Sequence, residues 1–212
     1  MDSPFLQRST CRVPQIVNVL DNIPLQRARV HECTGRAQAC FAMLVAARLA
    51  GPVFWIAPEW QRDALHPDGM RHFTKPQNFT FINPKRPEDI LWSMEEALRC
   101  AAVPLVVAEL QSLPGLTAVR RLHLAAEHNA KSNLTAPLGL LLTAGTGGAP
   151  GVESRWQMEP NHSVKTQRWQ LVRTLARTAP VKKWEVVQTR AGLQLQNPRT
   201  KQALPEPKPH HS

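Results

Sequence analysis

Residues 29–58 constrain the fold more than any other part of this sequence. Residues 30–34 form a short extended run, and Gly35 follows at the point where a strand must turn into a helix. Residues 37–50 are rich in alanine, leucine and methionine, which are strong helix formers, and a Gly-Pro pair ends the helix. Residues 53–57 are uniformly apolar, as in a central parallel strand buried on both faces. The segment therefore predicts a strand–turn–helix–strand unit, which often cradles a nucleotide phosphate at the helix N-terminus.

The alternation of strands and helices continues to residue 143. Apolar runs of strand length are separated by segments whose apolar residues recur at helical spacing. This pattern predicts βαβ crossovers and a mainly parallel sheet. The glycine-rich loop that follows lies beyond a strand's carboxyl end, where open α/β sheets bind ligands. The expected strands are residues 79–82, 104–110 and 138–143, the helices are residues 87–101 and 116–130, and the loop is residues 144–151.

The pattern changes after residue 151, because polar and apolar side chains begin to alternate. Such alternation predicts antiparallel strands that extend the sheet. Each of the three runs carries a tryptophan, which we expect in the core of the sheet, with base stacking as the alternative. The runs are residues 154–158, 168–175 and 183–189, and the tryptophans are Trp156, Trp169 and Trp184.

The chain divides into three expected parts. Residues 1–28 carry three prolines between short apolar pieces and predict an extended arm with at most one short helix, either docked on a neighbouring protein or frayed. Residues 29–196 form the α/β domain. Residues 197–212 are polar and proline-rich and predict a disordered tail. We recognise no membrane span or signal peptide and expect a cytoplasmic protein.

The turn at Gly35 departs from a phosphate-binding loop of the form GxxxxGK[ST]. The first glycine is present, but Cys40 replaces the second, Phe41 stands at the lysine position and Ala42 at the hydroxyl position. The helix N-terminus and Arg36 still offer donors to an anion. We interpret the loop as vestigial and expect neither ATP hydrolysis nor a bound cofactor.

Two carboxylates occupy positions where ATPases place catalytic acids. Glu109 stands in the strand of residues 104–110 where a magnesium-holding aspartate is usual, and Glu59 follows the strand of residues 53–57. With no lysine to hold a terminal phosphate, both are interpreted as vestigial, or as helix caps or surface residues. No cysteine pair has CxxC spacing, so we expect no metal site.

The chain is basic, with 26 lysines and arginines against 16 acidic residues and a net charge of +10. Cationic side chains neutralise phosphates, so the clusters predict a DNA- or partner-binding surface. A solvated charged face is the alternative. The candidate residues are Arg120 and Arg121 on an outward helix face, with Arg168, Arg173, Arg177, Lys182 and Lys183 in the C-terminal third.

A set of motifs between residues 29 and 190 resembles the RecA-like ImuA family of bacterial mutasomes. The segments that carry the resemblance are RVHECTG, GPVFWIAPE, PLVVAEL, LTAVRRLHLAAE, PLGLLLTAG, ESRWQMEP and the pair RWQLVRTLAR and KKWEVV. The resemblance implies a RecA-like, P-loop NTPase-type, three-layer αβα fold whose parallel sheet is extended by antiparallel strands. It also implies a protein that acts by binding.

The resemblance implies a role as a non-hydrolysing adaptor in DNA damage tolerance, that is, in SOS mutagenesis and error-prone translesion synthesis. The expected partners are a Y-family-like polymerase subunit and RecA, with DNA as a further candidate. Two alternatives stay open. One is a SulA-like inhibitor of cell division that acts by stoichiometric binding, and the other is a weak ATPase with an aberrant phosphate loop.

Overall fold

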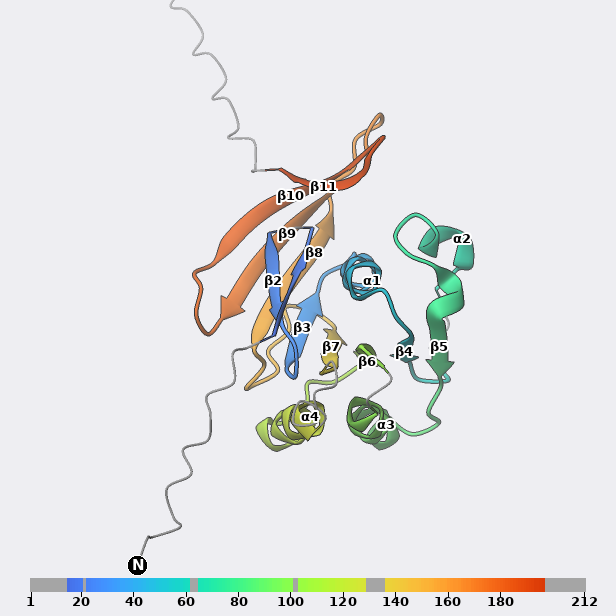
Figure 1. Ribbon diagram of the computed structural model, residues 1–212, viewed down its shortest axis with the longest axis vertical. Coiled ribbons are helices and arrows are strands. Elements are labelled where there is room, and N and C mark those ends of the chain that lie inside the picture. The colour runs from blue at the N-terminus through green and yellow to red at the C-terminus, as the bar shows by residue number, and fades with distance from the viewer. Residues whose placement is uncertain (1–14, 21, 62–64, 101–102, 129–135, 197–212) are drawn as a thin grey trace, which may run out of the picture.

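The computed structural model describes residues 15–20, 22–61, 65–100, 103–128 and 136–196 (Figure 1). These residues form a nine-stranded sheet and a separate two-stranded hairpin. In spatial order the sheet contains β11 (Gly192–Gln196), β10 (Lys182–Thr189), β9 (Arg168–Ala176), β8 (Ser154–Pro160), β3 (Val30–Thr34), β7 (Leu138–Thr143), β6 (Leu105–Leu110), β4 (Val53–Ile56) and β5 (Phe79–Ile82).

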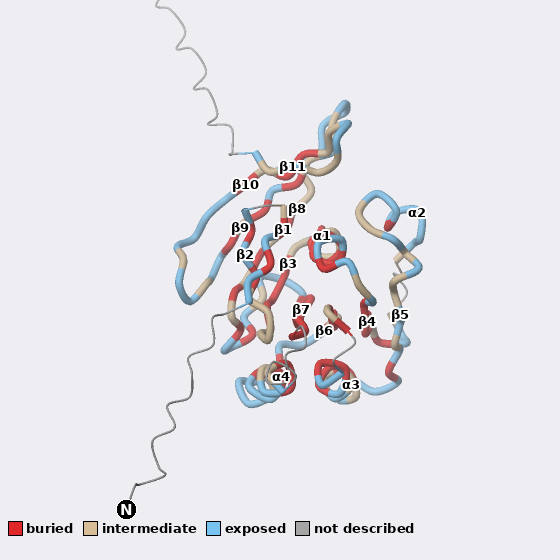
Figure 2. The backbone as a smooth tube through the Cα atoms, in the orientation of Figure 1, coloured by how far each residue is buried: buried red, intermediate tan, exposed pale blue. Residues whose placement is uncertain are grey.

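Helices cover both faces of the sheet. Helix α1 (Gln38–Leu49) lies on one face, and α3 (Pro87–Arg99) and α4 (Leu116–His128) lie side by side on the other (Figure 1). Each helix turns its buried side to the sheet (Figure 2). Two short helical turns, α2 (Pro67–Met70) and the 3-10 helix η1 (Pro76–Asn78), connect β4 to β5. The prediction of an α/β fold with a mainly parallel sheet and C-terminal antiparallel strands is confirmed.

The parallel part of the sheet is longer than the sequence pattern indicates. All neighbouring pairs from β8 to β5 are parallel, and antiparallel pairing starts between β8 and β9. The prediction that residues 154–158 form one of the antiparallel strands is confirmed for the pairing with β9, but it is wrong for the pairing with β3, which is parallel. The loop after β7 returns the chain to the amino edge of the sheet, where the Glu153 N–H donates to the Val30 carbonyl at 2.9 Å. That return fixes β8 parallel to β3.

Residues 16–26 form a hairpin rather than the expected extended arm. Strands β1 (Ile16–Val19) and β2 (Ile23–Gln26) pair with alternating buried and exposed residues. The buried side chains join the core formed by α1 and by Trp156 and Trp184. Pro24 does not break β2, because a two-stranded hairpin has a free edge for it. Residues 1–14, and the predicted tail of residues 197–212, lie outside the described residues.

The hairpin covers an aromatic core on the antiparallel strands. Trp156, Trp169 and Trp184 are all buried, which confirms their predicted place in the core. The rings of Phe41 and Trp156 stack with centroids 5.6 Å apart, and Trp156 and Trp184 lie 5.8 Å apart. Because all three tryptophans are buried, their rings are not available to stack on nucleic-acid bases. The last strand, β11, was not expected; it begins at Gly192, whose φ is +111°, directly after the turn at residues 190–191.

No helix in the described ranges is long and apolar enough to cross a lipid bilayer.

The burial of the hairpin predicts how much it contributes to the stability of the fold. Leu25 is fully buried, so Leu25→Ala is expected to lower the free energy of unfolding by about 2–5 kcal/mol. Ile16 on the same hairpin is 58% exposed, so Ile16→Ala should change it by less than about 0.5 kcal/mol. Urea denaturation followed by tryptophan fluorescence measures both. Equal effects would show that the hairpin unfolds independently of the domain.

Candidate functional site at the carboxyl edge of the sheet

The parallel strands bring the predicted nucleotide-site residues to one edge of the sheet. Gly35 and Arg36 follow β3, Glu59 follows β4, and Glu109 lies near the end of β6. The carboxyl ends of parallel strands form the edge at which α/β proteins bind ligands. The structure therefore places these residues at one edge of the sheet, and their contacts decide what they do there.

The glycine turn is closed by the end of β8. Gly35 has φ +93°, and a Cβ atom added to it would lie 2.4 Å from the Met158 carbonyl oxygen and 2.7 Å from Glu159 Oε1. The Ala37 N–H at the start of α1 donates to that same Met158 oxygen at 3.0 Å. The close approach of β8 therefore accounts for the glycine, because no side chain fits between the turn and the strand.

The groups around this turn disfavour the binding of a phosphate. The Glu159 carboxylate lies beside it, 3.1 Å from Arg36 Nε, and the Met158 carbonyl uses one helix N-terminal donor. Phe41 and Ala42 are fully buried, and Phe41 packs against Trp156. The two positions that hold a lysine and a hydroxyl in a phosphate loop thus point into the core.

The two predicted carboxylates play different parts. Glu109 accepts hydrogen bonds from Trp55 Nε1, at 2.5 Å, and from Gln61 Nε2. It therefore ties β6 to β4 and to the segment after β4. Glu59 is exposed, and its backbone N–H donates to the Pro84 carbonyl at 3.1 Å. Within the described ranges, no group of three or more His, Cys, Asp or Glu side chains is arranged to hold a metal ion.

The predicted basic residues do not form one surface. Arg121 pairs with Glu95 at 2.6 Å, and Arg168 lies 3.5 Å from Glu185. Arg120 is exposed and makes no ion pair with any described residue. These three positions therefore differ in how much charge they present to a ligand.

Arg173 is a core residue, so its prediction as part of a binding surface is wrong. Its guanidinium lies 5.8 Å from the ring centroid of Trp156 and 5.5 Å from that of Trp184. It donates to the Pro180 carbonyl at 3.0 and 3.1 Å. Position 173 shares the inward face of β9 with Leu171, so its charge is buried against aromatic faces and holds the turn after β9.

A shallow groove brings Arg120 and Arg177 together. It has a volume of about 450 Å³ and lies between α4 and the segments at Arg29 and Gly151. His123 Nε2 lies 3.1 Å from the Gly151 carbonyl. Burial first, and then the charges of Arg29 and Arg177, lower the pKa of His123 to about 4 against that bond. The remaining lining residues are Leu116, Leu124 and Glu127.

Lys182 and Lys183 begin β10 beside the same turn that Arg173 holds. Both are exposed. Arg177 lies at the start of that turn, with 59% of its side chain exposed. The structure therefore groups Arg177, Lys182 and Lys183 around residues 177–181 and leaves Arg168 at the far end of β9.

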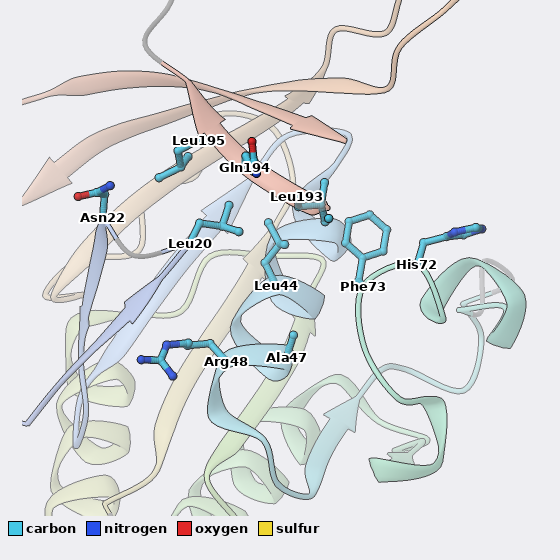
Figure 3. Close-up of a pocket in the computed structure, with 11 residues that line it drawn as sticks. Leu20, Asn22, Leu44, Ala47, Arg48, His72, Phe73, Leu193, Gln194 and Leu195 are labelled. Carbon is cyan, nitrogen blue, oxygen red and sulfur yellow. The ribbon is translucent and has the colours of Figure 1, made fainter. Parts of the chain in front are cut away.

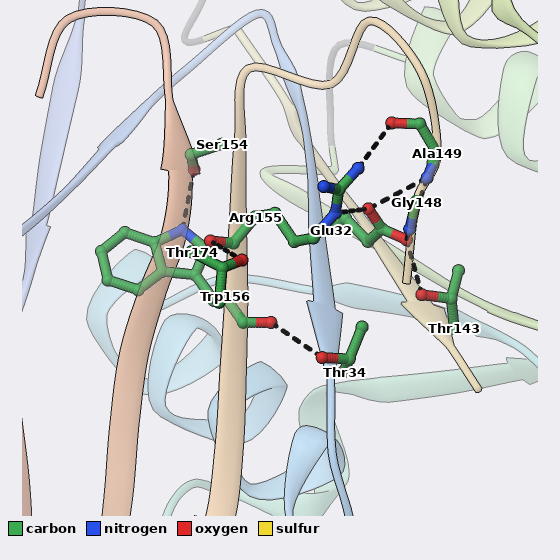
Figure 4. A network of polar contacts seen from close by, with 9 residues as sticks. All are labelled: Glu32, Thr34, Thr143, Gly148, Ala149, Ser154, Arg155, Trp156 and Thr174. Carbon is green, nitrogen blue, oxygen red and sulfur yellow. Dashed lines mark hydrogen bonds and ion pairs between the residues drawn. The ribbon is translucent and has the colours of Figure 1, made fainter. Parts of the chain in front are cut away.

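A buried carboxylate network was not predicted from the sequence (Figure 4). Glu32 in β3 is fully buried and pairs with Arg155 Nε at 2.5 Å. Its oxygens also accept from Thr143 Oγ1 at 2.7 Å and from the N–H groups of Gly148 and Ala149 at 3.0 and 3.2 Å. The glycine-rich loop of residues 144–151 is therefore held at its centre by hydrogen bonds to Glu32. The available signal was a glutamate in the middle of a run that was expected to form a strand of the core.

A second buried network was also not predicted from the sequence. His31 Nδ1 lies 2.7 Å from Ser154 Oγ, and His31 Nε2 lies 2.9 Å from the Gln26 carbonyl. Ser154 Oγ accepts from Trp156 Nε1 at 2.7 Å. The serine hydroxyl therefore donates to the neutral imidazole and the other ring nitrogen donates to Gln26. Every polar atom of the set has a partner, which makes this a structural link between β3, β8 and the hairpin.

A scan of protein-family models finds no match to this chain, and a search of curated protein sequences finds no significant relative.

The Glu32 network predicts a large penalty for removing its charge. Glu32→Gln should lower the free energy of unfolding by about 3–5 kcal/mol, because Arg155 then remains as a largely buried, uncompensated cation. Glu159→Gln removes a partner of the exposed Arg36 and should cost less than about 1 kcal/mol. Guanidinium denaturation of both variants measures the difference. Similar losses for the two would contradict this role of Glu32.

His31 predicts a loss of stability in acid. Burial lowers the pKa of His31 to about 4, below its ordinary value of 6.5. Below pH 6.5 the unfolded chain takes up a proton that the folded chain excludes, so the free energy of unfolding falls as the pH drops from about 6.5 to 4, by up to about 3 kcal/mol. Urea denaturation at several pH values should show a shallower slope in His31→Asn. The exposed His66→Asn is the control, and an unchanged slope in His31→Asn would contradict the assignment.

Proposed function

We propose that this chain is a non-hydrolysing RecA-like adaptor in DNA damage tolerance, acting in error-prone translesion synthesis. The proposed partners are a Y-family-like polymerase subunit and RecA, in the cytoplasm. The observation that carries the proposal is the closed glycine turn, where Met158 and Glu159 of β8 occupy the phosphate side of β3 and α1. The motifs between residues 29 and 190 supply the family resemblance.

The strand order supports a RecA-type core over a dinucleotide-binding one. Strand β3, which leads into the glycine turn, is separated from β4 by β7 and β6. In dinucleotide-binding and flavodoxin-like sheets the first strand pairs directly with the second. Insertion of later strands between the first two is compatible with the fold that the resemblance implies.

The lack of a phosphate grip supports action by binding. Arg120 and Arg177 share one groove, and Lys182 and Lys183 flank the neighbouring turn. Glu127 also lines the groove, and Arg177 lies 3.5 Å from Glu153, but Arg177 keeps more than half of its side chain exposed. Exposed cations suit both the phosphates of DNA and an acidic protein surface. In this proposal these four residues contact the polymerase-like partner or DNA.

The two alternative functions lead to different experimental results. A division inhibitor requires neither DNA nor a polymerase partner, and its overproduction alone produces filamentous cells. A weak ATPase requires measurable binding of ATP with magnesium. Calorimetry on the purified chain should show no heat with ATP up to millimolar concentration, and clear heat would replace the adaptor proposal with a nucleotide-dependent switch.

The basic surface is tested by reversing its charge in the full chain. The combined variant Arg120→Glu, Arg177→Glu, Lys182→Glu and Lys183→Glu should weaken binding to labelled single-stranded DNA or to the polymerase-like subunit at least tenfold. The control reverses four other exposed cations, namely Arg71, Lys75, Lys85 and Lys165. A salt series separates phosphate contacts from other contacts, because each lost contact lowers the slope by about 0.7 for single strands.

Equal losses of binding for the two variants would show that binding depends only on the net charge of the chain, and would contradict the proposed site. Retention of every partner by the first variant would contradict the adaptor role. Deletion of residues 1–28 is not a suitable test of docking, because residues 16–26 belong to the core of this domain.

A further inference from the structure

A pocket of about 650 Å³ opens between the N-terminal hairpin, α1 and the last strand of the sheet. Figure 3 shows Leu44 reaching from α1 towards Leu193 of β11, with Leu20 on one side and Phe73 on the other. This volume lies within the range of about 300–1,000 Å³ that is typical of ligand pockets. The pocket is separate from the groove that holds Arg120 and Arg177.

One wall of the pocket is an unpaired strand edge. Strand β11 ends the nine-stranded sheet and pairs with β10 alone. Gln188 of β10 donates to Gln167 on the β9 side at 3.0 Å. By the alternation of an antiparallel ladder, Gly192, Gln194 and Gln196 then bond to β10, and the N–H and C=O groups of Leu193 and Leu195 face outward. No described residue bonds to these outward groups.

This edge lacks the usual protection against strand pairing. Natural edge strands carry charged side chains, prolines or bulges that block the addition of another chain. Strand β11 has the sequence GLQLQ and contains none of the charged or proline residues. An open, uncharged edge beside a pocket with an apolar floor is the arrangement that peptide-binding sheets use, with main-chain bonds for affinity and pockets for alternate side chains.

The lining of the pocket defines the chemistry of the ligand. Leu20, Leu44 and Phe73 provide an apolar floor. Arg48 and His72 stand at the rim, and the described lining residues include no aspartate or glutamate. Arg48 Nε is held by the Asn18 carbonyl at 2.9 Å, which keeps the guanidinium at the mouth of the pocket. A large apolar side chain flanked by carboxylates matches this surface.

We propose that β11 and this pocket bind an extended peptide segment of a partner protein by strand addition. The segment adds beside Leu193 and Leu195 and pairs with their free backbone groups. Its alternate side chains face the α1 side of the sheet, where one large apolar residue enters the pocket and a neighbouring carboxylate meets Arg48. The surface lies apart from the basic groove, so its test is independent of the adaptor role.

The probe is a fluorescein-labelled synthetic peptide of about ten residues in which leucine and phenylalanine alternate with aspartate and threonine. Fluorescence anisotropy with the full chain should show saturable binding in the micromolar range. A peptide of identical sequence with N-methyl groups at alternate residues loses the donors of the added strand and should bind at least tenfold more weakly. A third peptide with lysine in place of aspartate should also bind more weakly.

Pocket variants with matched controls locate the site. Ala47→Trp fills the hollow from the exposed side of α1, and Arg48→Glu reverses the charge at its mouth; each should weaken binding at least tenfold. Thr117→Trp on α4 and Lys85→Glu before α3 place the same changes at other exposed positions and should leave binding within about twofold. Hydrogen exchange should slow at the amides of Leu193 and Leu195, whereas Gln194 is already bonded within the sheet.

Several results would overturn the proposal. These are no saturable binding of the first peptide, equal binding of the N-methylated peptide, or equal losses for Ala47→Trp and Thr117→Trp. Sedimentation of the full chain adds a further outcome. A dimer that forms without peptide and is abolished by Ala47→Trp would assign this edge to a second copy of the chain instead.

Discussion

The buried carboxylate of Glu32 holds together the parts of the molecule on which the rest depends. It joins β3 to Arg155 on β8, to Thr143 at the end of β7, and to the loop that links those two strands. A buried charge is tolerated only when it is fully paired and hydrogen-bonded, so each of these elements has one permitted position. The network thereby fixes β8 parallel to β3, and β8 in turn carries the residues that close the glycine turn.

The closed turn explains how this strand–turn–helix unit keeps its conformation through contacts within the protein. In a phosphate loop the glycine and the helix N-terminus surround an anion. Here the Met158 carbonyl and the Glu159 side chain take that place, and Phe41 and Ala42 fill the core with apolar volume. Apolar packing and the approach of β8 therefore set the conformation of this segment. The two proposed recognition surfaces, the exposed cations and the open sheet edge, both lie away from this turn.

Much of the parallel core was predictable, because each element has its own periodic signal. The buried runs that became β4, β6 and β7 and the amphipathic pattern of α3 and α4 gave correct element types. The hairpin was missed because its bends use Leu20 and Ala28, with φ of +46° and +58°, where a glycine would have marked a turn. For the site, Phe41 and Ala42 already indicated a lost phosphate grip. Arg173 alternates in step with Trp169 and Leu171, so it lies on the same buried face of the strand. The sequence contained this signal, but counting basic residues did not reveal it.

The sequence by itself determined the main strands and helices between residues 30 and 189, that the tryptophans lie in the core, and that the turn at Gly35 lacks a phosphate-binding lysine. These features depend on residue identity and on neighbours two to four positions away. The tertiary structure decided the direction of β8, the docking of the hairpin, and which arginines reach solvent. Each of these depends on contacts between distant residues, such as Glu32 and Arg155, which are 123 positions apart. Local periodicity carries no record of such pairings, because only the folded chain brings the two charges together.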